Sequence, residues 1–317
     1  METESTVYDV LACDVLKQAD RSEWLKWRTA APAVGASEIH ALFGITGDKR
    51  FTHSQFSLWE RRTVPALTEA DAEGEVEEAN FGNLMETPIL TRWQAKNPGV
   101  TVVPWIQTEI CVARDFPGFC TPDAIGYDDD GSFLIEVKAW DEAAAWLWAE
   151  GIPDRVLVQV QHQMRVTGIH RAVVVVMFGN KIHKLETHRV EFDSGMGEDI
   201  AERCERFARY VTEGVEPPVD GSAMTYDAVL RLHPDDNGET VELDPEFDLL
   251  SAEWDRLKTE AKIIDKRLDE IKNRLCAAIG DNTFGETPGG RRWSWKTIAR
   301  KAYTVAEGTY RKLHKSA

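Results

Sequence analysis

The stretch CTPDAIGYDDDGSFLIEVK, from Cys120 to Lys138, determines the fold that this chain can adopt. It holds two apolar segments around Asp128-Asp129-Asp130-Gly131, a strong hairpin signal because aspartate and glycine favour tight turns. The first segment begins next to Asp123, and the second carries Glu136 and Lys138. Side chains two residues apart share one face of a strand, and paired strands lie about 4.8 Å apart. We therefore expect the two carboxylates and the lysine to converge on one spot.

That arrangement predicts a metal-dependent hydrolase. Two carboxylates supply hard oxygen ligands to Mg²⁺ and leave positions for water and a phosphate oxygen, while a lysine can steady or deprotonate the water. Such a site hydrolyses phosphodiesters. The alternative is that Asp123 only begins a turn and that Glu136 and Lys138 face solvent. The apolar residues Phe133 and Ile135 on the same strand favour the site.

A further carboxylate lies upstream. Glu86 falls inside Phe81 to Lys96, which has the apolar spacing of a helix with one buried side. An isolated ion within such a helix is costly without a metal or a partner, although an exposed helix glutamate explains the same residue.

Outward from the deciding stretch, the pattern predicts alternating helices and strands. The expected helices are two between Asp20 and Phe43, the second opened near Ser37 as N-cap, then Phe81 to Lys96, Asp141 to Glu150, Asp154 to Thr167 and Gly197 to Thr212. The expected strands are an antiparallel meander of Thr101 to Ala113, Gly118 to Tyr127 and Ser132 to Lys138, then a buried strand from Arg171 to Phe178 with Lys181 to Val190 beside it. This order predicts one α/β domain over residues 1–222.

The C-terminal part has a different character. Residues 223–245 are rich in Pro, Gly and Asp and are expected to form a linker. Over 246–280, a coiled-coil seam repeats with alternating spacings of four and three and ends at Gly280: Leu250, Trp254, Leu257, Ala261, Ile264, Leu268, Ile271 and Leu275. The seam packs either on its own domain or on another chain. Residues 281–317 form a basic tail in which a short hairpin is expected.

Composition narrows the class of protein. The chain of 317 residues is 43% hydrophobic, enough for a sizeable core, and it has no long apolar run or signal-peptide pattern, so we expect a soluble cytoplasmic protein. Five scattered cysteines without a CxxC pair argue against structural zinc or iron–sulfur sites. The net charge of −17 argues against bulk coating of nucleic acid but allows a local basic channel. The segment Arg291 to Ala317 is locally basic, with eight Lys and Arg against Glu307.

Taken together, six segments resemble the lambda-exonuclease (YqaJ-like) viral recombinases, a family of PD-(D/E)XK nucleases. They occur in family order between Glu23 and Phe178, about half of the chain: Trp24-Leu-Lys-Trp-Arg28, Gly35-Ala-Ser37-Glu-Ile, Gly82-Asn-Leu-Met-Glu86, Cys120-Thr-Pro-Asp123, Glu136-Val-Lys138 and Gln159-Val-Gln161-His-Gln-Met-Arg-Val-Thr167-Gly. The resemblance implies a restriction-endonuclease-like α/β core with a mixed sheet flanked by helices, and here a C-terminal helical, coiled-coil-like extension. After Lys138 this chain has Ala139-Trp140 where the family often has cysteine and proline.

The resemblance also implies an activity and partners. The expected enzyme is a Mg²⁺-dependent exonuclease, with Mn²⁺ as a substitute, that degrades linear double-stranded DNA from a 5′ end and leaves a 3′ single-stranded tail. Its partners would be DNA ends, a single-strand annealing protein of phage or prophage recombination, and copies of itself in a ring-shaped trimer, with no membrane.

The roles transfer by position. Asp123 and Glu136 resemble the metal ligands with the Val137 carbonyl beside them, Lys138 the water-activating lysine, and Glu86 the carboxylate that supports a second metal.

The resemblance also implies a glutamine motif beside the active centre and a pocket for the terminal phosphate. Gln159 and Gln161 resemble the family's glutamines, and because they point about 200° apart on a helix, the sequence leaves open which one faces the site. Arg28 and Ser37 resemble the pocket for the terminal 5′-phosphate, as a guanidinium fork and a hydroxyl suit a phosphate. A surface ion pair for Arg28 and a simple N-cap for Ser37 are the alternatives.

Other basic and aromatic residues could touch DNA or serve only the fold. Lys26, Lys49 and Arg50 fit DNA contact or a solvated face, and Trp293 and Trp295 fit base stacking or a hairpin core.

Two other functions explain part of the sequence. A RecB-like or Cas4-like endonuclease is disfavoured by the absence of cluster cysteines and of a GxxxxGK[ST] motif. A non-catalytic DNA-end-binding scaffold is disfavoured by the intact Asp123, Glu136 and Lys138.

Overall fold

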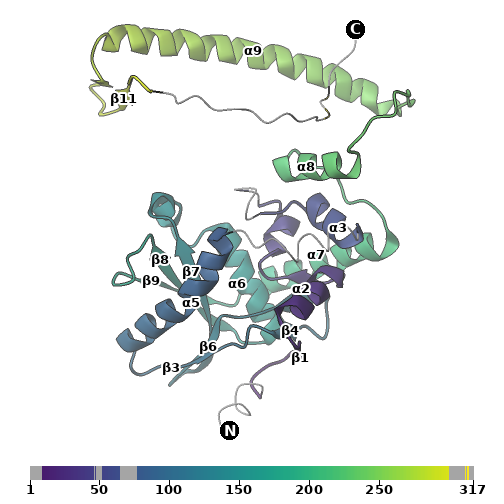
Figure 1. Cartoon of the computed structure of the whole chain (residues 1–317), viewed down its shortest axis with the longest axis vertical. Coiled ribbons are helices and arrows are strands. Elements are labelled where there is room, and N and C mark those ends of the chain that lie inside the picture. The colour runs from purple at the N-terminus through teal and green to yellow at the C-terminus, as the bar shows by residue number, and fades with distance from the viewer. Residues whose placement is uncertain are drawn as a thin grey trace. The chain divides into compact units, whose positions relative to one another are not determined.

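The structure is a computed structural model that describes residues 9–45, 47, 52–64, 77–299, 311 and 313. The chain divides into two compact units at His233 and Pro234, and each is described by itself (Figure 1). None of the described helices is long and apolar enough to cross a membrane.

A five-stranded mixed sheet forms the centre of the first unit. In sheet order the strands are β3 (Thr101–Pro104), β6 (Ala124–Asp128), β7 (Gly131–Trp140), β8 (Arg171–Phe178) and β9 (Glu186–Glu191). The pair β7 and β8 is parallel and the other pairs are antiparallel. The parallel pair requires a crossover connection, which the helix α6 (Asp154–Thr167) supplies.

Helices cover both faces of this sheet (Figure 1). The odd-numbered residues Phe133, Ile135 and Val137 of β7 pack with α5 (Glu77–Lys96), whereas Leu134 belongs to the core on the α6 side. The alternation of side chains along a strand places Glu136 on the α6 side too. This arrangement confirms the expected α/β core with a mixed sheet flanked by helices.

The predicted hairpin between β6 and β7 is confirmed. Asp128 pairs with Gly131 across the turn, and Gly131 adopts φ of 103°, a conformation that favours glycine. Arg171 on β8 binds Asp128 at 2.7 Å and ties the turn to the next strand.

The predicted antiparallel meander is confirmed in β3, β6 and β7, but each of its first two predicted runs is divided into two strands. The run Thr101 to Ala113 is divided between β3 and β4 (Glu109–Val112), and the run Gly118 to Tyr127 between β5 (Gly118–Cys120) and β6. Strands β4 and β5 belong to a second sheet, in the order β1 (Asp14–Lys17), β4, β5 and β2 (Val34–Gly35).

Pro122 gives the physical reason for this division. It lies between β5 and β6 and has no N–H to continue a strand ladder. Opposite it, the Trp105 N–H donates to the Asp123 carbonyl at 3.0 Å, where β3 ends.

Several helices differ from their predicted form. The helix α2 (Arg21–Ala30) begins at the N-cap Asp20, but the second expected helix is a short 3₁₀ segment, η1 (Ile39–Phe43), with Glu38 and not Ser37 at its N-cap. The expected helix over Asp141 to Glu150 is the 3₁₀ segment η2 (Glu142–Trp148). Helix α7 is longer than predicted, and α3 was not predicted; their bounds are Ser194–Glu213 and Gln55–Thr63.

The expected linker contains a helix of the first unit, α8 (Ala223–Leu232). Arg231 on α8 donates to both carboxylate oxygens of Glu60 on α3, at 2.9 and 2.6 Å, and Glu60 is completely buried. Thr225 donates to the Ser54 hydroxyl at 2.7 Å. The core of the first unit therefore extends to the end of α8.

The second unit contains the predicted long helix, α9 (Glu246–Ile279), and a hairpin of β10 (Phe284–Glu286) and β11 (Arg292–Ser294). Most of the basic tail beyond residue 299 lies outside the described residues, as do Lys49 and Arg50. Trp293 and Trp295 are about half exposed, and their stacking on bases stays a prediction.

We predict that Arg231→Ala lowers the free energy of unfolding by about 3 kcal/mol, because it leaves the buried Glu60 carboxylate without its bidentate partner. Arg206→Ala is the control, since Arg206 pairs with the exposed Glu202 within one helix, and it should cost less than about 0.5 kcal/mol. Urea unfolding of both variants measures the difference. Equal small losses would contradict the structural role of the α8 contact.

Candidate active site

The Asp123 side chain is bound to the backbone of β7. The Val137 N–H donates to Asp123 Oδ2 at 2.6 Å. Since Asp123 immediately precedes β6, the antiparallel pairing of β6 with β7 brings it opposite Glu136. The fold thereby places the two carboxylates together, as the spacing in the sequence predicts.

Glu136 is 2% exposed and is surrounded by hydrogen-bond donors. Its Oε1 accepts from Lys138 Nζ and, at 2.6 Å, from Gln159 Nε2. Its Oε2 accepts from Gln163 Nε2 at 2.6 Å. Two turns of α6 therefore fix this carboxylate from one side while its own strand supplies the lysine.

Glu86 on α5 belongs to the same electrostatic cluster. Burial raises the pKa of Glu86 to about 7, and the charge of Glu136 adds to the effect. The Gln107 side chain donates to Glu86 at 3.1 Å. The helix glutamate is thus half-buried and close enough to sense the strand carboxylates.

The pKa of Asp123 is affected by burial and by the same neighbouring charges. Burial raises its pKa well above the ordinary range, and the charges of Glu136 and Glu86 raise it further, whereas Lys138 opposes them. One lysine faces three carboxylates, so the cluster has an excess of negative charge that a divalent cation would offset.

The donor set fits Mg²⁺ or Mn²⁺. Asp123, Glu136 and Glu86, with the Val137 carbonyl, offer only oxygen ligands, which these cations prefer. Within the described ranges, no three His, Cys, Asp or Glu side chains are already arranged as a metal site. In this arrangement Lys138 Nζ contacts Glu136 Oε1, and a cation would share or displace that contact.

Gln159 and Gln161 of α6 face in different directions. Gln159 faces the cluster, where its Oε1 also accepts from Lys138 at 3.1 Å. Gln161 points away, donating to the Glu191 carbonyl and accepting from the Asp193 N–H, both at 2.9 Å. The structure therefore places only Gln159 of the two beside the carboxylates.

Gln163 is the site residue that the sequence analysis missed. It is 1% exposed and binds Glu136 directly. Its position four residues after Gln159 was the available signal, because residues four apart lie on one face of a helix.

The carboxylates, the lysine and the glutamines described above all lie between residues 23 and 170. Residues 23–170 match the model of the YqaJ-like viral recombinase domain. The chain carries a YqaJ-like viral recombinase domain. This confirms the resemblance that the sequence motifs indicated, and no curated protein sequence matches the chain significantly.

Solved structures show a looser likeness. An alkaline exonuclease, LHK-Exo, from Laribacter hongkongensis is 16% identical with a TM-score of 0.44, and the match covers 61% of this chain and 93% of that one. The same exonuclease in complex with dAMP is 18% identical with a TM-score of 0.45 and the same coverage. The structure of SSO0001 is 11% identical with a TM-score of 0.40, covering 68% of this chain and 98% of that one.

The recombinase domain also brings Arg28 and Ser37 together. Arg28 Nη2 donates to Ser37 Oγ at 2.9 Å and lies 3.1 Å from Glu38 Oε1. Arg62 binds the other oxygen of Glu38 at 2.8 Å. Burial alone would raise the pKa of Glu38, but Arg28 and Arg62 outweigh it and hold the pKa below its ordinary value. Lys26, on the same helix as Arg28, is exposed.

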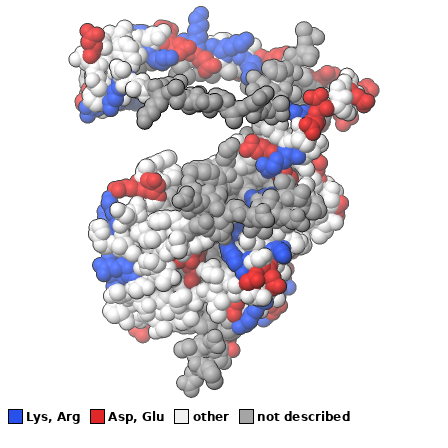
Figure 2. Space-filling view, viewed as in Figure 1, with Lys and Arg blue, Asp and Glu red and all other residues white. Residues whose placement is uncertain are grey.

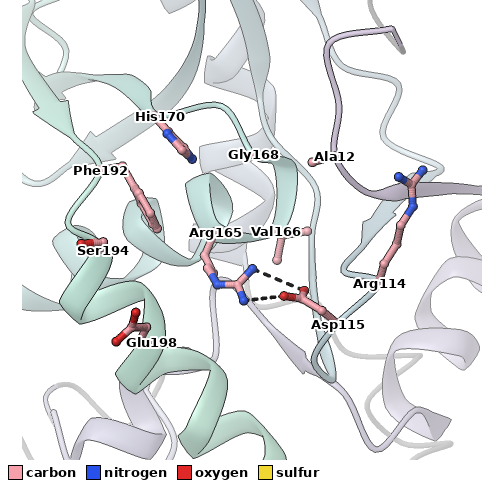
Figure 3. Close-up of a pocket in the computed structure, with 10 residues that line it drawn as sticks. All are labelled: Ala12, Arg114, Asp115, Arg165, Val166, Gly168, His170, Phe192, Ser194 and Glu198. Carbon is pink, nitrogen blue, oxygen red and sulfur yellow. Dashed lines mark hydrogen bonds and ion pairs between the residues drawn. The ribbon is translucent and has the colours of Figure 1, made fainter.

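A surface cavity of about 430 Å³ lies elsewhere on the domain, beside the end of α6 and the start of α7 (Figure 3). Arg165 and Asp115 meet across it with a hydrogen bond of 2.6 Å. None of the candidate site residues lines this cavity. The carboxylate cluster is therefore distinct from it.

We predict that Glu38→Gln lowers the free energy of unfolding by about 3 kcal/mol near neutral pH, because two arginines lose their shared anion. The folded pKa of Glu38 lies below its ordinary value of 4.5, so its stabilisation is present above pH 4.5 and is lost as pH falls below that value.

Urea unfolding of parent and variant between about pH 3 and 7 measures this difference. The gap between them should be constant above about pH 5.5 and shrink under more acidic conditions. A gap that does not change down to pH 3 would contradict the assigned charge. The control Glu202→Gln, which breaks an exposed pair, should change little at any pH.

Proposed function

We propose that this chain is a metal-dependent exonuclease that digests one strand of linear double-stranded DNA from its 5′ end. The product would be a 3′ single-stranded tail used in phage-type recombination by strand annealing. The observation that carries the proposal is the meeting of Asp123, Glu136 and Lys138 beside Glu86, within a YqaJ-like domain.

The side chains of the cluster have separate tasks in this proposal. Asp123, Glu136, Glu86 and the Val137 carbonyl would hold Mg²⁺ or Mn²⁺, which stabilises the charge that develops on the cleaved phosphate. Lys138, which contacts Glu136 and Gln159, would orient the attacking water or, in its neutral form, accept its proton. Gln159 and Gln163 keep the Glu136 carboxylate in one orientation.

Arg28 and Ser37 would receive the terminal 5′-phosphate. Their side chains already form a hydrogen bond, and together they present guanidinium and hydroxyl donors that suit a phosphate. Glu38 holds Arg28 from the other side. The buried Arg62 shares the charge of Glu38, so part of the positive charge of Arg28 stays available to an incoming anion.

DNA ends would be recognised through phosphates and not through base sequence. Further partners in this proposal are a single-strand annealing protein and two more copies of the chain in a trimeric ring. The ring would keep the enzyme on its substrate.

We predict that the parent protein, supplied with Mg²⁺, releases a label from the 5′ ends of linear duplex DNA and spares a 3′ label in the opposite strand. EDTA should stop the release. Asp123→Asn and Lys138→Ala should lower the rate by about 10²-fold or more, because each removes a group that acts on the reacting phosphate or water. Asp129→Asn in the exposed turn is the matched control and should digest at the parental rate.

Other outcomes would replace the proposal. Cleavage of circular DNA would favour an endonuclease, and binding of DNA ends without cleavage under Mg²⁺ or Mn²⁺ would favour a scaffold. A Lys138→Ala variant with parental activity would remove the lysine from the mechanism.

We predict that Gln163→Leu lowers the digestion rate by about 10 to 100-fold, since groups that orient a metal-binding carboxylate contribute to that extent. Gln161→Leu is the matched control on the same helix, because Gln161 is equally buried but bonds to the backbone at β9 and α7. It should lose stability and keep the rate per folded molecule. Initial rates, corrected for the folded fraction from circular dichroism, distinguish the two variants, and equal rates would disprove the positioning role.

A further inference from the structure

Helix α9 exposes a continuous apolar stripe. Six large side chains of its seam are between 39 and 59% exposed: Leu250, Trp254, Leu257, Ile264, Leu268 and Ile271. From Leu250 to Leu275 the stripe is roughly 38 Å long at 1.5 Å per residue. An apolar stripe of this length on a helix normally packs against a partner.

The seam residues define the heptad positions of α9. Trp254, Ala261, Leu268 and Leu275 occupy a positions, and Leu250, Leu257, Ile264 and Ile271 occupy d positions. The flanking g positions are Glu253, Glu260, Arg267 and Arg274, and the e positions are Ser251, Lys258, Asp265 and Lys272. The g positions are thus acidic in the first half of the helix and basic in the second half.

This division of charge is complementary to itself when two copies run antiparallel. In that orientation g faces g and e faces e, because the two helices are related by a two-fold axis across the seam. With the axis midway between Ala261 and Ile264, Glu260 faces Arg267 of the second copy. By the same symmetry Glu253 faces Arg274, and Lys258 faces Asp265. Every charged pair formed this way is attractive.

The apolar layers match in the same register. Each a residue lies opposite a d residue of the second copy, and the small Ala261 meets the larger Ile264 at the centre. Trp254 meets Ile271, and Leu257 meets Leu268, so the whole stripe is covered. A shift by one heptad would place Arg267 against Arg267, or Glu260 against Glu260.

A parallel pair is electrostatically poor. There each g residue faces the e residue five positions later in the other helix. Glu253 would still meet Lys258, but Glu260 would meet Asp265 and Arg267 would meet Lys272. Like charges at these positions repel and select against the parallel orientation.

Ion pairs within α9 do not prevent this association. Glu260 binds Arg256 at 2.6 Å and Arg267 binds Glu270 at 2.6 Å, each between side chains that are more than half exposed. Exposed pairs of this kind within a helix are weak, so they can be shared or exchanged. Acidic and basic side chains are interspersed on the viewed surface of the second unit (Figure 2).

We propose that α9 binds α9 of a second copy of this chain as an antiparallel two-stranded coiled coil. The contact joins two recombinase domains through their C-terminal units. It is separate from any ring that the domains themselves form, and it does not depend on the nuclease activity.

The first test compares two neighbouring isoleucines in the full-length chain. Ile264→Asp places a charge in the seam, whereas Ile263→Asp does so at an outward c position that is 67% exposed. Sedimentation equilibrium should show that Ile264→Asp halves the number of chains in the assembly and that Ile263→Asp leaves it unchanged. Circular dichroism checks that both variants keep their fold. A parent that is monomeric, or an Ile264→Asp variant that assembles like the parent, would overturn the proposal.

The second test determines orientation by charge. Asp265→Lys faces Lys258 in the antiparallel pair and should raise the concentration at half-dissociation about tenfold. Adding Lys258→Glu should restore it, because the attractive pair returns with its signs exchanged. In a parallel pair Asp265→Lys would instead remove the repulsion by Glu260 and tighten the assembly, which would overturn the antiparallel assignment.

Discussion

The recombinase domain is organised around a shared excess of negative charge, where β6 begins beside the middle of β7. Asp123, Glu136 and Glu86 raise one another's electrostatic cost in a partly buried place, and Lys138 compensates only part of it. A cluster of this kind is unfavourable for a protein whose only requirement is stability. The surrounding elements hold these carboxylates by hydrogen bonds, and in the proposed function a divalent cation would offset the remaining negative charge.

Hydrogen bonds and packing from the surrounding elements hold the carboxylates together despite their electrostatic repulsion. The strand pairing of β6 with β7 holds Asp123 through the Val137 amide, and the apolar side of β7 is buried under α5. On the opposite face α6 supplies two glutamines one helical turn apart, while the rest of the helix packs into the main core. The crossover helix that makes β7 and β8 parallel is therefore the same helix that orients the candidate metal ligand.

The two units differ in the side chains that they contain. The first unit contains all the candidate chemistry, and its residue Arg231, 171 positions from Glu60, extends the core through α8. The second unit has a long helix with an exposed seam, and few of its described side chains are buried. Its charge pattern has a two-fold symmetry along the helix, which is a property suited to self-association and unrelated to phosphodiester cleavage.

The amino-acid sequence alone determines the parts of this protein that depend on local periodicity and turn chemistry. The hairpin at Asp128 to Gly131, the shared strand face of Glu136 and Lys138, and the seam of α9 all follow from spacings within a few residues. The tertiary structure decides what depends on distant partners. Pro122 and the hydrogen bond from Trp105 to Asp123 divide two expected strands between two sheets. Gln161 accepts a hydrogen bond from the Asp193 N–H and therefore points away from the site. Glu38 is buried between Arg28 and Arg62, which stabilise its charge. The desolvation of a buried ion and the ion pairs that offset it arise only when separate elements pack together.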